Sequence, residues 1–187
     1  HSVEAYKAAE PSVRWAALLH DVGKKVACER QGNMHGHDAI GAELVRERLA
    51  ALGMPPRRVR RTAELTACHM ADLKGDMSEN KLRLFIAEHA DIMDDLTALK
   101  RADAYATRGE DVGELRIERL WREMRSDGTP FSVGDLPVDG TDAQAAGLSG
   151  REIGDALSAL LREAVINPVL RDRARALAFL KKRADRL

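Results

Sequence analysis

The sequence predicts an all-α fold, and three observations lead to this prediction. Aromatic residues make up only 4% of the chain, whereas 44% of its residues are hydrophobic and 32% are charged. Ala, Leu, Arg and Glu are abundant, and these residue types favour helices over strands. Apolar residues also recur at spacings of three and four, which is the period of an amphipathic helix. At 187 residues, the chain can form one large or two small domains.

Seven segments carry this helical spacing, and turn-forming Gly and Pro residues separate them. In chain order, the predicted helices cover residues 13–26, 38–52, 59–70, 81–106, 114–124, 151–161 and 169–187. Asp38 and Ser78 precede two of them and are suitable N-caps, because their side-chain oxygens can accept hydrogen bonds from the first backbone N–H groups. The Pro55-Pro56 pair separates the second helix from the third.

The chain divides at a segment of different composition. Gly and Pro are frequent in residues 126–150, which are predicted to form turns rather than a helix. We therefore expect a helical domain over residues 1–125, a loop or linker over 126–150, and a small helical tail over 151–187. A shorter polar loop is expected over 29–36. All six histidines lie in the first of these parts.

Charge and cysteine content narrow the class of protein. The 30 basic and 30 acidic residues give a formal net charge of zero, so contact with nucleic acid must come from local basic patches. The sequence has two cysteines but no CxxC pair, no signal peptide, and no apolar run near the ~18 residues of a membrane span. We expect a soluble, cytoplasmic protein that binds no membrane. Because it opens at His1 without a methionine, we expect it to be a piece of a longer polypeptide.

The sharpest motif is AALLHDVGK at residues 16–24. An apolar helix leads directly into the adjacent pair His20-Asp21. Neighbouring side chains on a helix point about 100° apart, so both can reach one metal ion only at a helix end or kink. Gly23 supplies such a place. Imidazole and carboxylate together suit divalent ions such as Mn, Ni, Fe, Co, Zn or Mg.

Three histidines and one further carboxylate could complete a metal site with this pair. Asp103 lies on an apolar-lined predicted helix, where an unpaired carboxylate would be costly. The two expected ligand sets share Asp21 and are His1, His20, Asp21 and Asp103, and Asp21, His37 and His69. These sets could hold one or two ions. The neighbouring Asp38 is better placed to cap a helix than to bind metal.

The order of a lone histidine, a His-Asp pair and a distant aspartate resembles the HD superfamily of metal-dependent phosphohydrolases. His37, with a glycine four residues later, and His69 resemble the two extra histidines of some members. The resemblance implies that both ligand sets bind metal, and that a metal-bound water or hydroxide attacks a phosphate ester. It also implies catalytic roles for two residues. Asp21 would bridge the metals or orient the nucleophile, and Lys24 would face the phosphate.

A narrower resemblance covers most of the chain. The segments RWAALLHDVGK, CHM, DDLTALKRAD, PFSVGDLPVDG and GLSGREIGDALSALLREAV occur in this order. They resemble the HD and C-terminal region of bacterial CCA-adding enzymes, which are tRNA nucleotidyltransferases of the poly(A) polymerase family. This implies tRNA, or a phosphoester or nucleotide, as the partner. The family's head domain carries a Gly-Ser turn and a D-x-D pair, which we do not find here, so we do not expect this chain alone to add nucleotides.

Two basic clusters are candidate RNA contacts. The first is in a stretch where no acid intervenes between Gly53 and Glu64, and it consists of Arg57, Arg58, Arg60 and Arg61. The second lies in the tail and includes Arg171, Arg175, Lys181 and Lys182. Such runs are usually solvated helix faces offset by nearby acids, and contact with a phosphate backbone is the functional alternative.

Three functions remain open from the sequence. The first is a phosphohydrolase acting on phosphomonoesters or cyclic phosphodiesters, as the HD region of a tRNA nucleotidyltransferase-like protein. The second is a non-catalytic module that positions tRNA and keeps only a remnant of the metal site. The third is a stand-alone HD nucleotide phosphohydrolase whose tail could form a homo-oligomer. Replacing His20 and Asp21 by Ala separates the first two. The first predicts that hydrolysis is abolished, and the second predicts that RNA affinity stays intact.

Overall fold

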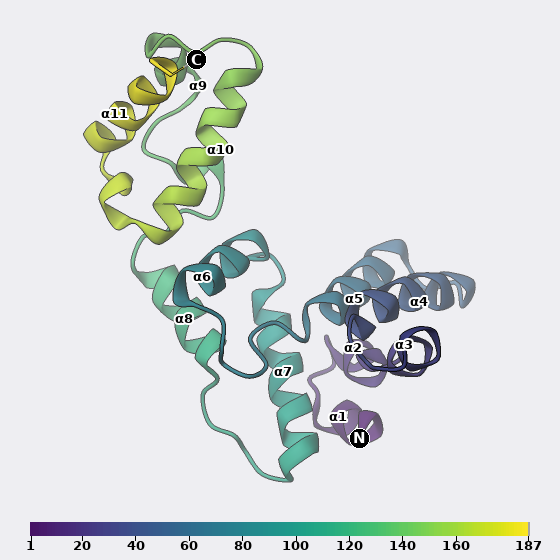
Figure 1. The fold of residues 1–187 in the computed structure, drawn as a ribbon. Helices are drawn as coiled ribbons and strands as arrows, with labels where there is room; N and C mark the ends of the chain where they lie inside the picture. The colour runs from purple at the N-terminus through teal and green to yellow at the C-terminus, as the bar shows by residue number, and fades with distance from the viewer. Residues whose placement is uncertain (187) are drawn as a thin grey trace. The chain divides into compact units, whose positions relative to one another are not determined.

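The computed structural model describes residues 1–186, and every regular element among them is helical (Figure 1). The prediction of an all-α fold is therefore confirmed. The α-helices are α1 Ser2–Ala8, α2 Arg14–Leu19, α3 Lys24–Gln31, α4 His37–Ala51, α5 Pro56–Cys68, α6 Glu79–Glu88, α7 Met93–Arg108, α8 Arg116–Ser126, α9 Gly140–Ala145, α10 Arg151–Ile166 and α11 Arg173–Ala184. Two 3-10 helices are η1 Val133–Asp135 and η2 Pro168–Arg171. None of the helices in this described part has the length and apolar character that a membrane span requires.

The chain packs as two compact units, each built from segments that are distant in sequence. The first unit comprises His1–Asp76 and Asp91–Glu118, and the second comprises Met77–Ala90 and the residues from Arg119 onward. These units do not follow the expected boundary at residue 126, which was drawn from composition rather than from packing. The division into domain, linker and tail stays a prediction.

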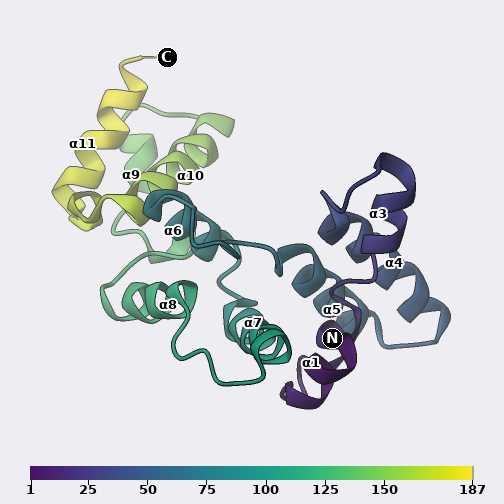
Figure 2. The same cartoon turned by 60° about the horizontal axis from the view of Figure 1, so that its bottom comes forward.

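In the first unit, α4 and α5 pack along each other (Figure 2). Helix α1 contacts both α2 and α7. Val45 and Leu49 of α4 meet Val59 and Ala63 of α5 in one buried apolar cluster. In each helix these two residues lie four positions apart, so they share one face of the helix. Ser78, at the start of the second unit, caps α6 as predicted by accepting a hydrogen bond from a backbone N–H.

The predicted helix over residues 13–26 is two helices, α2 and α3, with a turn at residues 20–23 between them. Gly23 explains the break. A Cβ atom at this position would collide with the carbonyl oxygen of His37 and lie 2.6 Å from the backbone nitrogen of Gly41. Only glycine allows the turn to approach the start of α4 so closely. The second helix then runs to Gln31, so the expected polar loop is shorter than predicted.

The predicted helix over residues 81–106 is also two helices, α6 and α7, and they belong to different units. Arg61 holds the break between them, donating at 2.7 Å to the carbonyl oxygen of Asp91 and at 2.7 Å to the carboxylate of Asp95. Asp94 and Asp95 lie in the first turn of α7, where carboxylates stabilise a helix start. The spacing of apolar residues did not reveal this break, because the apolar residues of α6 and α7 both recur at spacings of three and four.

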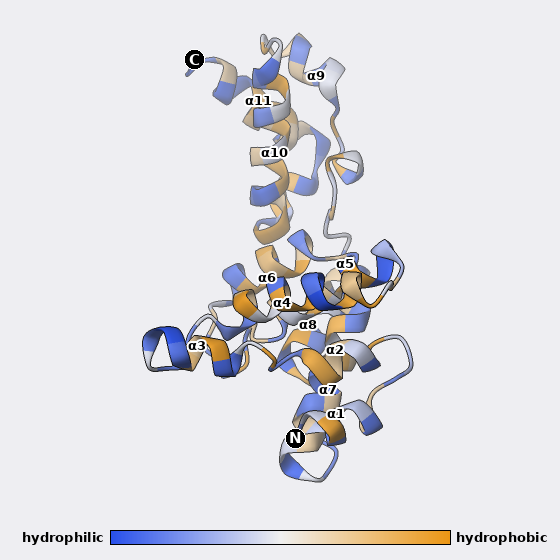
Figure 3. Cartoon of the chain, turned by 90° about the vertical axis from the view of Figure 1, so that its right-hand side faces the viewer, coloured by the Kyte–Doolittle hydropathy of each residue, from blue (hydrophilic) through white to orange (hydrophobic). Residues whose placement is uncertain are grey.

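The second unit has its own core, to which α9, α10 and α11 contribute (Figure 3). The expected loop over 126–150 contains η1 and α9, and α10 continues beyond the predicted end to Ile166. The predicted helix over 169–187 is η2 followed by α11. Asp172 separates these two elements, because its carboxylate accepts a 3.1 Å hydrogen bond from the backbone N–H of Arg175 and so caps α11.

Candidate metal centre

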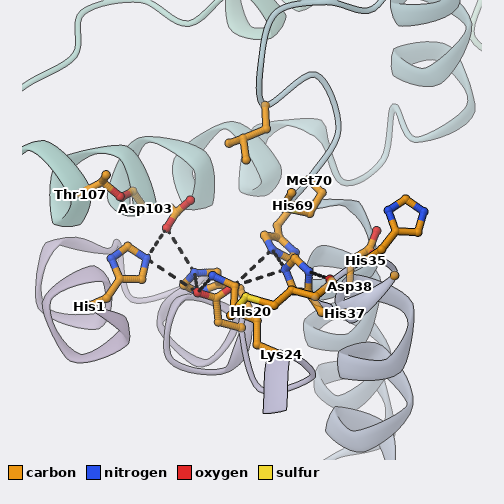
Figure 4. A pocket seen from close by; sticks show the side chains of 14 residues that line it. His1, His20, Lys24, His35, His37, Asp38, His69, Met70, Asp103 and Thr107 are labelled. Carbon is orange, nitrogen blue, oxygen red and sulfur yellow. Dashed lines mark hydrogen bonds and ion pairs between the residues drawn. The ribbon is translucent and has the colours of Figure 1, made fainter. Parts of the chain in front are cut away.

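Six residues that are far apart in sequence line one cavity of about 640 Å³ in the first unit (Figure 4). They are the predicted ligands His1, His20, Asp21, His37, His69 and Asp103. All but the last lie at or next to helix ends: before α1, after α2, at the start of α4 and after α5. The structure thus brings both expected ligand sets together in one cavity, and metal binding by these residues stays a prediction.

Three of the histidines share one hydrogen-bond arrangement. Nδ1 of His20, His37 and His69 lies 2.9, 2.8 and 2.6 Å, respectively, from the backbone carbonyl oxygen three residues earlier. A carbonyl oxygen only accepts, so each Nδ1 carries a proton and donates it. A neutral ring of this kind keeps a lone pair on Nε2, which is the atom available to a metal ion.

One group of donor atoms consists of Asp21, His37 and His69. The two histidine Nε2 atoms lie 3.3 Å apart, and Oδ1 of Asp21 lies 3.4 Å from the first and 3.8 Å from the second. Both rings already donate through Nδ1, so their Nε2 atoms and the carboxylate oxygen of Asp21 are the atoms left to bind a cation. The donor set fits a divalent ion.

The other group consists of His1, His20 and Asp103. Oδ1 of Asp103 lies 2.7 Å from Nε2 of His1 and 3.2 Å from Nε2 of His20. Oδ2 of Asp21 lies 3.3 Å from the same His20 atom and 4.0 Å from that of His1. The two carboxylate oxygens of Asp21 therefore face different groups. One side chain links both, as the shared ligand expected from the sequence.

Burial and charge act differently on the two groups. Burial disfavours the charged ring of His20, but hydrogen bonds with Asp103 and Asp21 outweigh burial and raise its pKa to about 9. Burial also opposes ionisation of Asp21, but hydrogen bonds with His20 and Lys24 hold its pKa below the ordinary value. For His69, burial lowers the pKa to about 4. Without metal, His20 is thus a cation at neutral pH, whereas His69 is a neutral ring.

Lys24 lies at the mouth of this cavity. Its Nζ donates a 2.6 Å hydrogen bond to Oδ2 of Asp21, and 40% of its side chain is exposed. The lysine begins α3, one residue after Gly23, so the turn that exposes the His-Asp pair also directs this cation to the cavity. A phosphate entering the cavity would meet a positive charge beside the ligand atoms.

The sequence did not indicate the apolar rim of the cavity. Met34, Met70 and Leu73 line it, and all three are exposed, which is uncommon for large apolar side chains in one place. Each lies within four positions of His37 or His69. That proximity was the only available signal, and it could not show which way the side chains point.

The first basic cluster lines a separate hollow beside α5. Arg57, Arg58 and Arg60 are exposed there. Arg61 instead forms ion pairs with Asp95 at 2.7 Å and Asp91 at 3.5 Å. No acidic residue interrupts this run in the sequence, but the fold places Asp91 and Asp95 beside Arg61. The exposed cations of the cluster are therefore the other three arginines.

In the tail cluster, too, one cation bonds within the fold and the others are exposed. Arg171 donates to the carbonyl oxygen of Ala164 at 3.1 Å and to that of Asp127 at 2.9 Å, so its guanidinium holds the second unit together. Arg175, Lys181 and Lys182 are exposed on α11. These three side chains remain candidates for contact with RNA.

Comparison with known proteins gives three findings. The HD domain family model matches residues 4–108. The chain is 39% identical over 108 residues to an A-adding tRNA nucleotidyltransferase of Deinococcus radiodurans, covering 55% of this chain and 24% of that protein. It is 33% identical over 169 residues to a CC-adding tRNA nucleotidyltransferase of Thermus thermophilus, covering 86% and 38%, respectively. The chain thus spans well under half the length of either relative. No solved structure matches it.

Proposed function

The chain belongs to the HD domain family, and we propose that its cavity holds divalent metal and hydrolyses phosphate esters within a tRNA nucleotidyltransferase-like protein. One observation carries the proposal. The ligand atoms converge in two groups, each with its atoms within 4.8 Å of one another, and Asp21 faces both. Imidazole nitrogens and carboxylate oxygens suit one or two ions of Mn, Ni, Fe, Co, Zn or Mg.

Each residue of the cavity has a proposed part. His1, His20 and Asp103 would hold one ion, and His37 and His69 would hold another, with Asp21 shared between them. A divalent ion bound there supplies Lewis acidity toward a phosphoryl oxygen and makes a water molecule more acidic. Lys24 neutralises phosphate charge at the mouth while its Nζ donates to Oδ2 of Asp21.

The proposed substrates are phosphomonoesters or 2′,3′-cyclic phosphates. A cavity of about 640 Å³ is in the size range of small-molecule sites. Its apolar rim of Met34, Met70 and Leu73 can cover the organic part of an ester while the phosphate lies at the ligand atoms. Both features support a small ester, free or at the end of a longer molecule, rather than the middle of a duplex.

A second proposed role is to hold tRNA, and the exposed arginines of α5 favour it. Arg57, Arg58 and Arg60 put three cations on one hollowed surface, which suits a phosphate backbone. Both relatives are named as tRNA nucleotidyltransferases. The role is independent of metal, so the chain can bind RNA whether or not the cavity is catalytic.

Elemental mass spectrometry on chain purified without chelator tests the first proposal. About one or two metal ions per chain are expected, together with hydrolysis of p-nitrophenyl phosphate or 2′,3′-cyclic AMP. Asp21→Ala should lose both. Asp38→Asn is the matched control, because Asp38 lines the same cavity but belongs to neither ligand group. If added Mn, Ni and Zn leave the chain metal-free, the hydrolase proposal fails and the tRNA-positioning role is favoured.

A further inference from the structure

His69 lies just outside a helix, in a segment of turns that connects α5 to α6. Helix α5 ends at Cys68, and residues 69–76 turn before α6 begins. The last carbonyl groups of a helix have no partner within it, so other groups must satisfy them. A side chain at such a place is positioned only as firmly as its backbone is held.

Lys100 supplies these partners from α7. Its Nζ lies 2.9 Å from the carbonyl oxygen of His69 and 2.6 Å from that of Ala71. The residue is only 7% exposed, and burying an ammonium group is costly unless hydrogen bonds compensate it. Burial lowers the pKa of Lys100 to about 8. Lys100 also lies one helical turn before Asp103, so the same helix carries a ligand of one group and holds the backbone of the other.

Arg116 binds the side chain of Asp72, the residue that follows Ala71 in the same segment. Its Nη1 lies 3.0 and 2.9 Å from the two carboxylate oxygens of Asp72, whose side chain is almost fully buried. Asp72 has a φ of +50°, and it is the only non-glycine residue among the described residues with positive φ. Aspartate adopts this left-handed conformation more readily than most residues, and the ion pair with Arg116 fixes its side chain. The backbone from His69 to Asp72 is therefore fixed from two other helices.

We propose that Lys100 and Arg116 are positioning residues that hold Nε2 of His69 within reach of Asp21 and His37. The inference rests on the proposed metal site and adds two residues to it. Both act through the backbone of residues 69–72. Loss of either should weaken metal binding at the group that contains His69. The group of His1, His20 and Asp103 should change less, because neither residue holds the backbone of its ligands and Lys100 affects it through its charge interaction with Asp103.

Metal titration of the full chain with Co²⁺, followed by calorimetry and elemental analysis, tests this inference. His69→Ala identifies the binding event that depends on this ligand. Lys100→Met should weaken the same event by about 10- to 100-fold, the range found when residues that orient metal ligands are replaced. Arg101→Met is the matched control, because Arg101 also lies on α7 and pairs with Glu118 instead of touching residues 69–72.

The outcomes separate this inference from the proposed function. If His69→Ala loses an ion and both Lys100→Met and Arg116→Met bind it as wild type does, the positioning role is wrong and the metal site stands. If wild type binds no ion, both proposals fail. Arg116→Met, at a half-exposed position, serves if Lys100→Met does not fold. The Arg101→Met variant shows what a loss of stability does by itself. Thermal unfolding measures that loss, and the affinity of this variant for Co²⁺ should equal that of wild type.

Discussion

Nε2 of His37 lies 3.3 Å from Nε2 of His69, while Nδ1 of each ring donates to a backbone carbonyl. Oδ1 of Asp21 lies 3.4 and 3.8 Å from these two Nε2 atoms, so three ligand atoms converge where a cation would fit. The backbone thus imposes on two histidines an orientation that favours metal binding.

Metal should stabilise the fold strongly. Removing it with a chelator leaves the converging ligand atoms without an ion, and restoring Mn, Ni or Zn should raise the temperature of unfolding. At a free ion concentration of 100 times Kd, the gain is about 2.7 kcal/mol in the free energy of unfolding. Calorimetry of wild type and Asp21→Ala checks this. An equal gain in the variant would show that the ion binds elsewhere.

The chelated protein should become less stable as pH rises from about 6.5 to 9. The pKa of His20 is about 9 in the folded chain against an ordinary 6.5, so its stabilising effect is complete below 6.5 and is lost as pH rises through 9. The expected loss is on the order of 1–3 kcal/mol, and urea unfolding measures it. His20→Ala should flatten this dependence. Constant or rising stability of the chelated wild type over this range would contradict the prediction.

Metal binding should release a proton. His20 is protonated at neutral pH in the metal-free chain, and an ion that takes its Nε2 must displace that proton. Below pH 9, affinity at the group of His1, His20 and Asp103 should therefore rise about tenfold per pH unit. Calorimetry at pH 7.5 in two buffers of different ionisation enthalpy counts the protons. No release would mean that His20 does not bind the ion.

Lys24→Ala should impair hydrolysis while leaving metal content unchanged. The lysine contacts Asp21 and faces the cavity but is not itself a ligand, so its loss removes charge stabilisation of the phosphate. A decrease of about 100-fold in kcat is expected, in line with the loss of one stabilising group. Steady-state kinetics with 2′,3′-cyclic AMP measures it. Lys25→Ala is the control, because Lys25 is adjacent and exposed.

RNA binding should depend on the exposed arginines of α5. Replacing Arg57 and Arg60 by Ala should weaken binding to tRNA and lower the salt slope by about 1 for each phosphate group that the chain no longer neutralises. Filter binding at several salt concentrations measures both quantities. Arg46→Ala is the control, since Arg46 is an exposed cation on α4 that pairs with Glu43. Equal weakening in the control would point to a general charge effect.

The all-α class and the candidate ligand residues could be named from the sequence because they rest on local properties. The spacing of apolar residues indicates helices whatever they pack against. The pair His20-Asp21 followed by Gly23 marks a helix end by its own chemistry. Asp103 stood out because an isolated carboxylate on an apolar face needs a partner, and the structure places it 2.7 Å from His1.

Other features were decided only by tertiary packing, because they join segments that no local pattern connects. The break between α6 and α7 is invisible in the apolar spacing, and Arg61, 30 residues earlier, holds it. That interaction also removes Arg61 from the expected set of exposed cations. Lys100 resembles an ordinary surface lysine in sequence, and only the folded chain buries it beneath the carbonyl group of His69. Sequence alone thus determined which groups could bind metal, and tertiary structure decided what orients them.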